Sequence, residues 1–179
     1  MKLERTEKLM RMFSDKVIRD AKRNLGDKGS GKLAKSLDYD LKVYPSGALE
    51  LNFKSEEYAK FVDKGVQGST GKAHPKSNKV RAQGSPYKYT TKMPPTKALD
   101  KWVVRKGLKG TRDEKGKFTK RKSIVFGVAR SIYLYGLPAT KFFEKAFTNN
   151  YKKLPADFTK AYANDVMKFI KATAQQIAK

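Results

Sequence analysis

Residues 37–54 read LDYDLKVYPSGALELNFK, and this stretch predicts a β-hairpin. Apolar residues at positions 37, 39, 41 and 43 alternate with polar ones, and the same alternation runs through 49, 51 and 53. A period of two with one polar face is typical of antiparallel strands that cover a core on one side. Pro45 and Gly47 lie between the two halves and favour a tight reversal. We therefore expect a small antiparallel sheet at the centre of the fold.

Helical patterns flank the hairpin on both sides. Residues 2–25 predict a long first helix that ends at Gly26. Its buried stripe is expected to be Met10, Phe13, Val17, Ala21 and Leu25. Further helices are expected from caps at Ser55, Thr96 and Ser123, and a last one begins near Pro155. The last helix repeats apolar or small residues at Phe158, Tyr162, Val166, Phe169, Thr173 and Ile177.

The order of these patterns predicts an α+β fold in a single domain, 1–179. A small antiparallel sheet is packed by a long N-terminal helix and by C-terminal helices. Residues 66–95 lose all periodicity and are rich in glycine and proline, which is usual for a functional loop or for one ordered by a partner. We expect residues 66–122 to form an extended basic insert, or arm, within the domain.

Positive charge is concentrated in this insert. The chain has 41 Lys and Arg against 17 Asp and Glu, a net charge of +24, and residues 64–122 alone carry 18 basic and 3 acidic side chains. Such asymmetry suggests a polyanion or an acidic protein face as partner, and a merely solvated surface is the alternative.

The candidate partner or DNA contacts are cations and tyrosines of the insert. They are Lys72, Lys76, Lys79, Arg81, Tyr87, Lys88, Tyr89, Lys92, Arg112, Lys115, Lys117, Lys120, Arg121 and Lys122. Lysine and arginine neutralise phosphates, and tyrosine can stack on exposed bases. No helix-turn-helix, zinc-finger or RNP signature can be read, so contact with nucleic acid is expected to be sequence-independent. The same arm can instead lie on a neighbouring subunit and meet an acidic face.

No catalytic, cofactor or metal site is predicted. Residues 26–33, GDKGSGKL, differ from a phosphate-binding loop because Leu33 replaces the hydroxyl residue and because the loop follows a helix instead of a strand. The chain has no cysteine, and His74 is its only histidine, expected to be a solvated loop residue. We therefore expect a protein that is not an enzyme. No apolar run is long enough for a membrane span, and no signal peptide is recognised, so a cytoplasmic site of synthesis is expected.

Several short stretches also follow one another in a characteristic order. GSGKLAKSL precedes the hairpin, YAKFVDKGVQG follows it, and SPYKY, MPPTKALDKWVVRKGL and SIVFGVARSIYLYGLPATKFFEKAF come later. This order resembles the tail-completion, or neck, proteins of tailed bacteriophages, minor virion proteins of head–tail joining. The matching residues are Tyr58, Ala59, Val62, Asp63 and Gly65 in one turn, and Pro138, Phe142, Phe143 and Ala146 before the last helix. The long insert and the charge depart from the compact form of that family.

The resemblance implies a structural protein without catalysis and without a membrane. It implies a homo-oligomeric ring, often a hexamer, that joins the portal or connector to the tail-tube proteins around the path of double-stranded DNA. The ring would be assembled in the bacterial host cytoplasm and located in the virion neck or tail. Tail terminator, completion ring and adaptor remain open as layers of the neck. The alternative function is a free, sequence-independent nucleic-acid-binding protein.

Overall fold

The computed structural model describes residues 2–26, 31–108, 110 and 119–177. The described part is mixed α+β, as the sequence predicts, with seven helices and two antiparallel sheets of two strands each. The chain divides into two compact units: unit 1 comprises residues 1–57 and 142–179, and unit 2 comprises residues 58–141. The predicted insert 66–122 lies inside unit 2, whose bounds are wider. That the whole chain forms a single domain stays a prediction.

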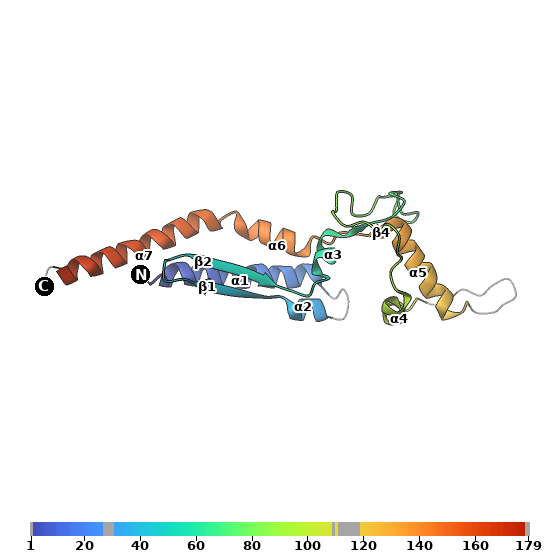
Figure 1. The fold of residues 1–179 in the computed structure, drawn as a ribbon, viewed down its shortest axis with the longest axis horizontal. Helices are drawn as coiled ribbons and strands as arrows, with labels where there is room; N and C mark the ends of the chain where they lie inside the picture. The colour runs from blue at the N-terminus through green and yellow to red at the C-terminus, as the bar shows by residue number, and fades with distance from the viewer. Residues whose placement is uncertain (1, 27–30, 109, 111–118, 178–179) are drawn as a thin grey trace. The chain divides into compact units, whose positions relative to one another are not determined.

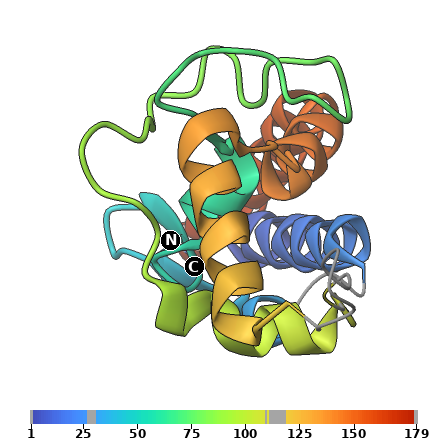
Figure 2. The same cartoon turned by 90° about the vertical axis from the view of Figure 1, so that its right-hand side faces the viewer.

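Unit 1 is built around the long first helix, α1 (Glu4–Leu25). This helix packs against the hairpin strand β1 (Asp38–Val43), which pairs with β2 (Leu49–Lys54), and against α6 (Phe142–Tyr151) and α7 (Leu154–Ile177) (Figures 1 and 2). The predicted stripe of α1 is buried along its whole length. One amphipathic helix thus supplies the core that the sheet and the later helices share.

The hairpin has the register that its alternation predicts. The apolar positions face each other in the pairs Tyr39↔Phe53, Leu41↔Leu51 and Val43↔Leu49. On this face the ring of Phe53 meets the edges of Phe143 and Phe147 at centroid distances of 5.2 and 6.2 Å. Phe147 also meets Phe13 of α1 at 5.9 Å. Edge-to-face aromatic contacts therefore link the sheet, α1 and α6.

The connection from α1 to the hairpin contains a helix that the sequence did not predict. Gly26 ends α1 as expected, and its N–H donates to the carbonyl oxygens of Lys22 and Arg23 at 3.2 and 3.1 Å. Helix α2 (Lys32–Ser36) follows, and strand β1 begins two residues after it. Leu33, at the position where a phosphate-binding loop requires a hydroxyl, is buried on α2. Residues 27–30 of this loop lie outside the described residues.

The N-terminus of α1 is capped by a side chain of α7. Residue Leu3 precedes α1 and provides no capping side chain. The buried carboxylate of Asp165 accepts hydrogen bonds from the Thr6 N–H and hydroxyl at 2.9 and 2.8 Å, and from the Arg5 N–H at 3.2 Å. Burial raises the pKa of Asp165, but these hydrogen bonds outweigh burial, so the pKa lies below its ordinary value. This carboxylate replaces the cap that the local sequence lacks.

Unit 2 begins with α3 (Ala59–Lys64), which starts later than predicted. Ser55 does not cap it. The spacing of Tyr58, Phe61 and Val62 in the sequence predicts that they share the buried face, but the buried residues are Ala59 and Asp63. The prediction failed because a six-residue helix has too few turns for its apolar spacing to reveal the buried side.

Two further helices form the other part of unit 2. The sequence predicts Thr96 as the N-cap of helix α4. In the structure Thr96 is the first residue of α4 (Thr96–Arg105), and Pro95 occupies the cap position. Helix α5 (Arg121–Tyr135) begins before Ser123 and ends at Gly136, as predicted. Their contact buries Val103 of α4 and Val125 of α5, at 2% and 4% exposure.

Candidate polyanion-binding surface

A pair of very short strands holds the base of the insert, which in the structure extends past residue 122 to the end of α5. Strand β3 (Val66–Gln67) pairs antiparallel with β4 (Gly136–Leu137). Next to this pair, the carbonyl oxygen of Val62 accepts hydrogen bonds from the Thr140 N–H and hydroxyl at 3.1 and 2.8 Å, and that of Asp63 accepts one from the Lys141 N–H at 2.9 Å. The residues that leave for the insert are thereby bonded to those that return from it.

Glycine is required where these segments cross. A Cβ atom at Gly68 would lie 2.1 Å from the backbone oxygen of Leu134, and one at Gly136 would lie 2.2 Å from that of Val66. Both distances are far below van der Waals contact, and Gly136 also has a φ of +78°. The close backbone approach makes the base of the insert rigid.

The segment 66–95 is ordered by its own chain. Gln67 lies at its centre: its N–H donates to the Tyr87 carbonyl at 2.8 Å, its carbonyl accepts from the Tyr89 N–H at 2.9 Å, and its side-chain amide donates to the Ser85 carbonyl at 2.7 Å. The Tyr133 hydroxyl donates to the carbonyl of Thr90 at 2.7 Å. Contacts within unit 2 therefore hold a segment whose composition is usual for a functional loop or for one ordered by a partner.

The tyrosines that could stack on bases have aromatic neighbours within unit 2. The ring of Tyr87 meets Phe61 at a centroid distance of 4.6 Å, and that of Tyr89 lies 6.3 Å from Tyr133. Both tyrosines are half-buried, and burial raises the pKa of Tyr89. Their first role is packing, which leaves positive charge as the feature of this segment that can attract a partner.

The predicted cations of segment 66–95 are exposed, with one exception. Exposed side chains are those of Lys72, Lys76, Lys79, Lys88 and Lys92. Arg81 is half-buried, and its Nη1 donates to the carbonyl oxygen of Gly136 at 3.1 Å. Arg81 therefore braces the base of the insert, whereas the lysines are available to solvent or to a partner.

His74 is packed, where a solvated loop residue was expected. Its ring meets Tyr135 edge-on at 5.2 Å, and its Nδ1 accepts a hydrogen bond from the Lys76 N–H at 3.2 Å. Burial, followed by the positive charges of Arg81 and Lys76, lowers its pKa. The imidazole is thus neutral at neutral pH and helps to close the turn between residues 74 and 79.

The remaining predicted cations lie around the start of α5. Lys120 occupies its cap position, and Arg121 and Lys122 are exposed in its first turn. The guanidinium of Arg121 forms a bidentate pair with Asp100 of α4, with Nε at 2.8 Å from Oδ1. The predicted residues Arg112, Lys115 and Lys117 lie outside the described residues.

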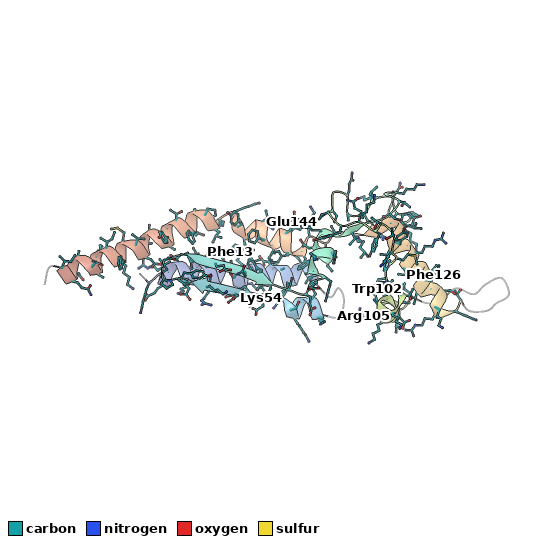
Figure 3. All side chains as sticks on the ribbon, viewed as in Figure 1. Phe13, Lys54, Trp102, Arg105, Phe126 and Glu144 are labelled. Atoms are coloured by element: carbon teal, nitrogen blue, oxygen red, sulfur yellow. The ribbon has the colours of Figure 1, made fainter. Side chains whose placement is uncertain are left out.

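An open cleft of about 660 Å³ lies between α4 and α5. Its lining residues are Thr96, Lys97, Asp100, Lys122, Ser123, Val125 and Phe126. Two lysines and two hydroxyls there suit an anion, and the half-exposed ring of Phe126 provides an apolar wall (Figure 3). Neither helix has a capping side chain or an acidic residue in its first turn. Lys97 and Phe126 were absent from the predicted contacts. The lack of acidic residues at the start of α4 was a signal that could have indicated Lys97, and no sequence signal indicated Phe126.

Unit 2 has far more cations than carboxylates. It contains 21 Lys and Arg and 4 Asp and Glu. Among its described residues the carboxylates are Asp63, which is buried, and Asp100, which pairs with Arg121. Internal ion pairs therefore leave most of the positive charge on the surface, where it can attract an anionic partner.

The described residues contain neither a metal cluster nor a membrane-spanning helix. No group of three or more His, Cys, Asp or Glu side chains there is arranged to hold a metal ion. Of the helices in the described ranges, none is long and apolar enough to cross a bilayer. Comparisons of the chain with protein-family models, with curated proteins and with solved structures gave no match.

Proposed function

We propose that the chain is a structural protein of the head–tail junction of a tailed bacteriophage, a neck or tail-completion ring that binds its neighbours and catalyses no reaction. The observation that carries the proposal is the crossing at the base of the insert. There Val62 and Asp63, from the first stretch that resembles the family, bond to Thr140 and Lys141, between Pro138 and Phe142 of the second. The two stretches are about 80 residues apart in the chain and adjacent in space.

The arrangement explains how a long insert is compatible with such a protein. Because the crossing is closed by backbone hydrogen bonds and by close glycine contacts, the insert can vary in length without changing its own base. The insert then presents lysines for the acidic faces of connector or tube subunits, or for the DNA that passes through the junction.

The charge of unit 2 supports a second candidate, a free nucleic-acid-binding protein. Two described carboxylates cannot neutralise the cations of this unit, and a lysine-lined cleft lies between α4 and α5. Such a protein would bind phosphate backbones without sequence preference.

One pair of measurements separates the two candidates. The purified full-length chain is analysed by sedimentation velocity and electron microscopy over a range of concentrations, and its binding to duplex DNA is titrated against salt. A ring protein is expected to form discrete closed oligomers whose size does not depend on DNA. A monomer at every concentration, with DNA affinity that falls steeply with salt, would contradict the neck proposal and support the alternative.

A further inference from the structure

Helix α7 turns its charged side toward α1. Asp165 is buried against the start of α1, where it accepts hydrogen bonds from Thr6. One turn further along, the Lys168 ammonium lies 2.9 Å from a carboxylate oxygen of Glu4. These polar contacts set the rotation of α7 about its own axis, because a half-turn of the helix would leave the Asp165 carboxylate unpaired.

The apolar side of α7 consequently faces away from α1. We call the residues Tyr162, Val166, Phe169, Ile170, Thr173 and Ile177 the α7 stripe. Four of them have large exposed fractions, 38% for Tyr162, 48% for Phe169, 53% for Ile170 and 81% for Ile177. Figure 1 shows the C-terminal half of α7 continuing past the start of α1. Aromatic and branched side chains in such a row are unusual on the surface of a protein that functions alone.

Charge is completely segregated on this helix. The charged residues of α7 are Asp157, Lys160, Asp165, Lys168 and Lys171. At roughly 100° per residue they occupy an arc of about 140°. The remaining arc, about 220° wide on the same geometry, includes the whole α7 stripe and carries no charge.

We propose that the α7 stripe is a self-association surface that packs against the α7 stripe of a second copy of the chain. The net charge of the chain is the reason for choosing a second copy as the partner of the stripe. The chain carries +24, so two copies repel through most of their surfaces, and a contact between them is favoured where charge is absent. An acidic partner would instead be attracted to cationic surfaces such as the cleft of unit 2.

Identical stripes are complementary to each other, and a contact between them has two-fold symmetry. Such a contact joins copies in pairs, so it is a different contact from the head-to-tail one that closes a ring. The stripe runs about 24 Å along the helix at ~1.5 Å per residue. That is a small surface beside the roughly 800 Å² per partner of a stable interface. The pair is therefore weak and forms at high protein concentration. An assembly that uses this contact throughout contains an even number of copies. The inference goes beyond the proposed function, because it concerns the contact between copies whatever their partner is.

Cross-linking tests the contact directly, because the chain has no cysteine of its own. Ile170→Cys places a thiol near the middle of the stripe. The matched control Lys171→Cys places one on the charged arc, about 100° around the helix from residue 170. Disulfide formation requires Cα atoms within about 7 Å. After oxidation with diamide, we expect covalent dimers of the full-length Ile170→Cys protein and at least tenfold fewer of Lys171→Cys. Equal yields from the two variants would overturn the proposal.

Sedimentation velocity supplies the second measurement. Ile170→Lys puts a charge into the stripe at an exposed site, and Gln175→Lys puts the same charge on the charged side of α7. We expect Ile170→Lys to weaken self-association at least tenfold and Gln175→Lys to leave it unchanged.

Three outcomes would overturn the inference. The first is a wild-type chain that stays monomeric even at high protein concentration. The second is an oligomer that Ile170→Lys does not affect. The third is an Ile170→Lys variant that self-associates like the wild type and has lost only its binding to phosphatidylcholine–phosphatidylglycerol vesicles. The second outcome leaves the ring proposal intact, since other surfaces would then hold the copies together.

Discussion

Asp165 is the residue on which the packing of α7 against α1 depends most directly. Its carboxylate is buried and accepts three hydrogen bonds from Arg5 and Thr6. Asp165→Asn removes the charge and offers one oxygen in place of two, so we expect a loss of about 1–3 kcal/mol in the free energy of unfolding. Urea denaturation of the variant and the wild type measures this difference in unfolding free energy. The control Asp38→Asn, at an exposed position, should stay within about 0.5 kcal/mol of the wild type.

The lowered pKa of Asp165 also predicts how the stability of the fold depends on pH. Because the pKa of Asp165 is lowered in the folded protein, its carboxylate stabilises the fold fully above the unfolded pKa of about 3.9. That contribution is lost as the pH falls through the lower, folded pKa. The stability difference between wild type and Asp165→Asn should therefore be largest above about pH 4 and disappear in stronger acid. A difference that stays constant down to pH 2 would show that the carboxylate charge has no part in it.

Gly68 and Gly127 predict opposite effects for the same substitution. A Cβ atom at Gly68 would meet the backbone of Leu134 at 2.1 Å, whereas Gly127, within α5, has open space around it. We expect Gly68→Ala to destabilise unit 2 by at least about 2 kcal/mol. Gly127→Ala should stabilise it by about 0.5–1 kcal/mol, because alanine favours the helix. Hydrogen exchange of residues 62–67 and 136–141 reports on the base of the insert, and equal protection in both variants would contradict the close contact.

At the scale of elements, the hairpin is held by its aromatic face. Phe53 contacts Phe143 and Phe147, so Phe53→Ala should cost about 2–4 kcal/mol of unfolding free energy. Lys42→Ala, at an exposed position of β1, should change it by less than about 0.5 kcal/mol. Chemical denaturation of both variants measures the difference, and similar values would mean that this face contributes little to the core.

Elements with several periods of pattern were predictable from the sequence. The alternation of 37–54 and the stripe of α1 each repeat often enough to identify the buried side, and both predictions were confirmed. Short helices were predicted less well: α2 was missed, and α3 was predicted with an earlier start. Helix α2 has five residues and α3 has six, so neither shows a period, and packing by Leu33 and Ala59 decides where they form. The cap from Asp165 could not be predicted either, because it joins residues about 160 positions apart.

For the whole molecule, the location of charge matters more than its sum. We expect the double variant Lys97→Glu/Lys122→Glu, in the cleft between α4 and α5, to lower affinity for duplex DNA at least tenfold. The slope of log affinity against log salt should fall by about 2, since each phosphate contact contributes about 0.9. The control Lys145→Glu/Lys152→Glu makes the same change in net charge on unit 1 and should have a much smaller effect. Equal effects would indicate attraction by net charge alone.

The candidate surface was predictable in its charge but not in its geometry. Composition identified the cationic segment and the exposed lysines within it. It could not show that Arg81 braces the backbone, that Tyr87 packs on Phe61, or that Lys97 and Lys122 line one cleft, because these contacts join segments of different elements.

The hydrogen bonds between Asp165 and Thr6 also set an order of events during synthesis. The start of α1 leaves the ribosome first, but its cap arrives only when residue 165 has been made. Unit 2, continuous from 58 to 141, is complete before that moment. Translation therefore completes the cationic unit 2 before the start of α1 can receive its cap, and the two units can fold in that order.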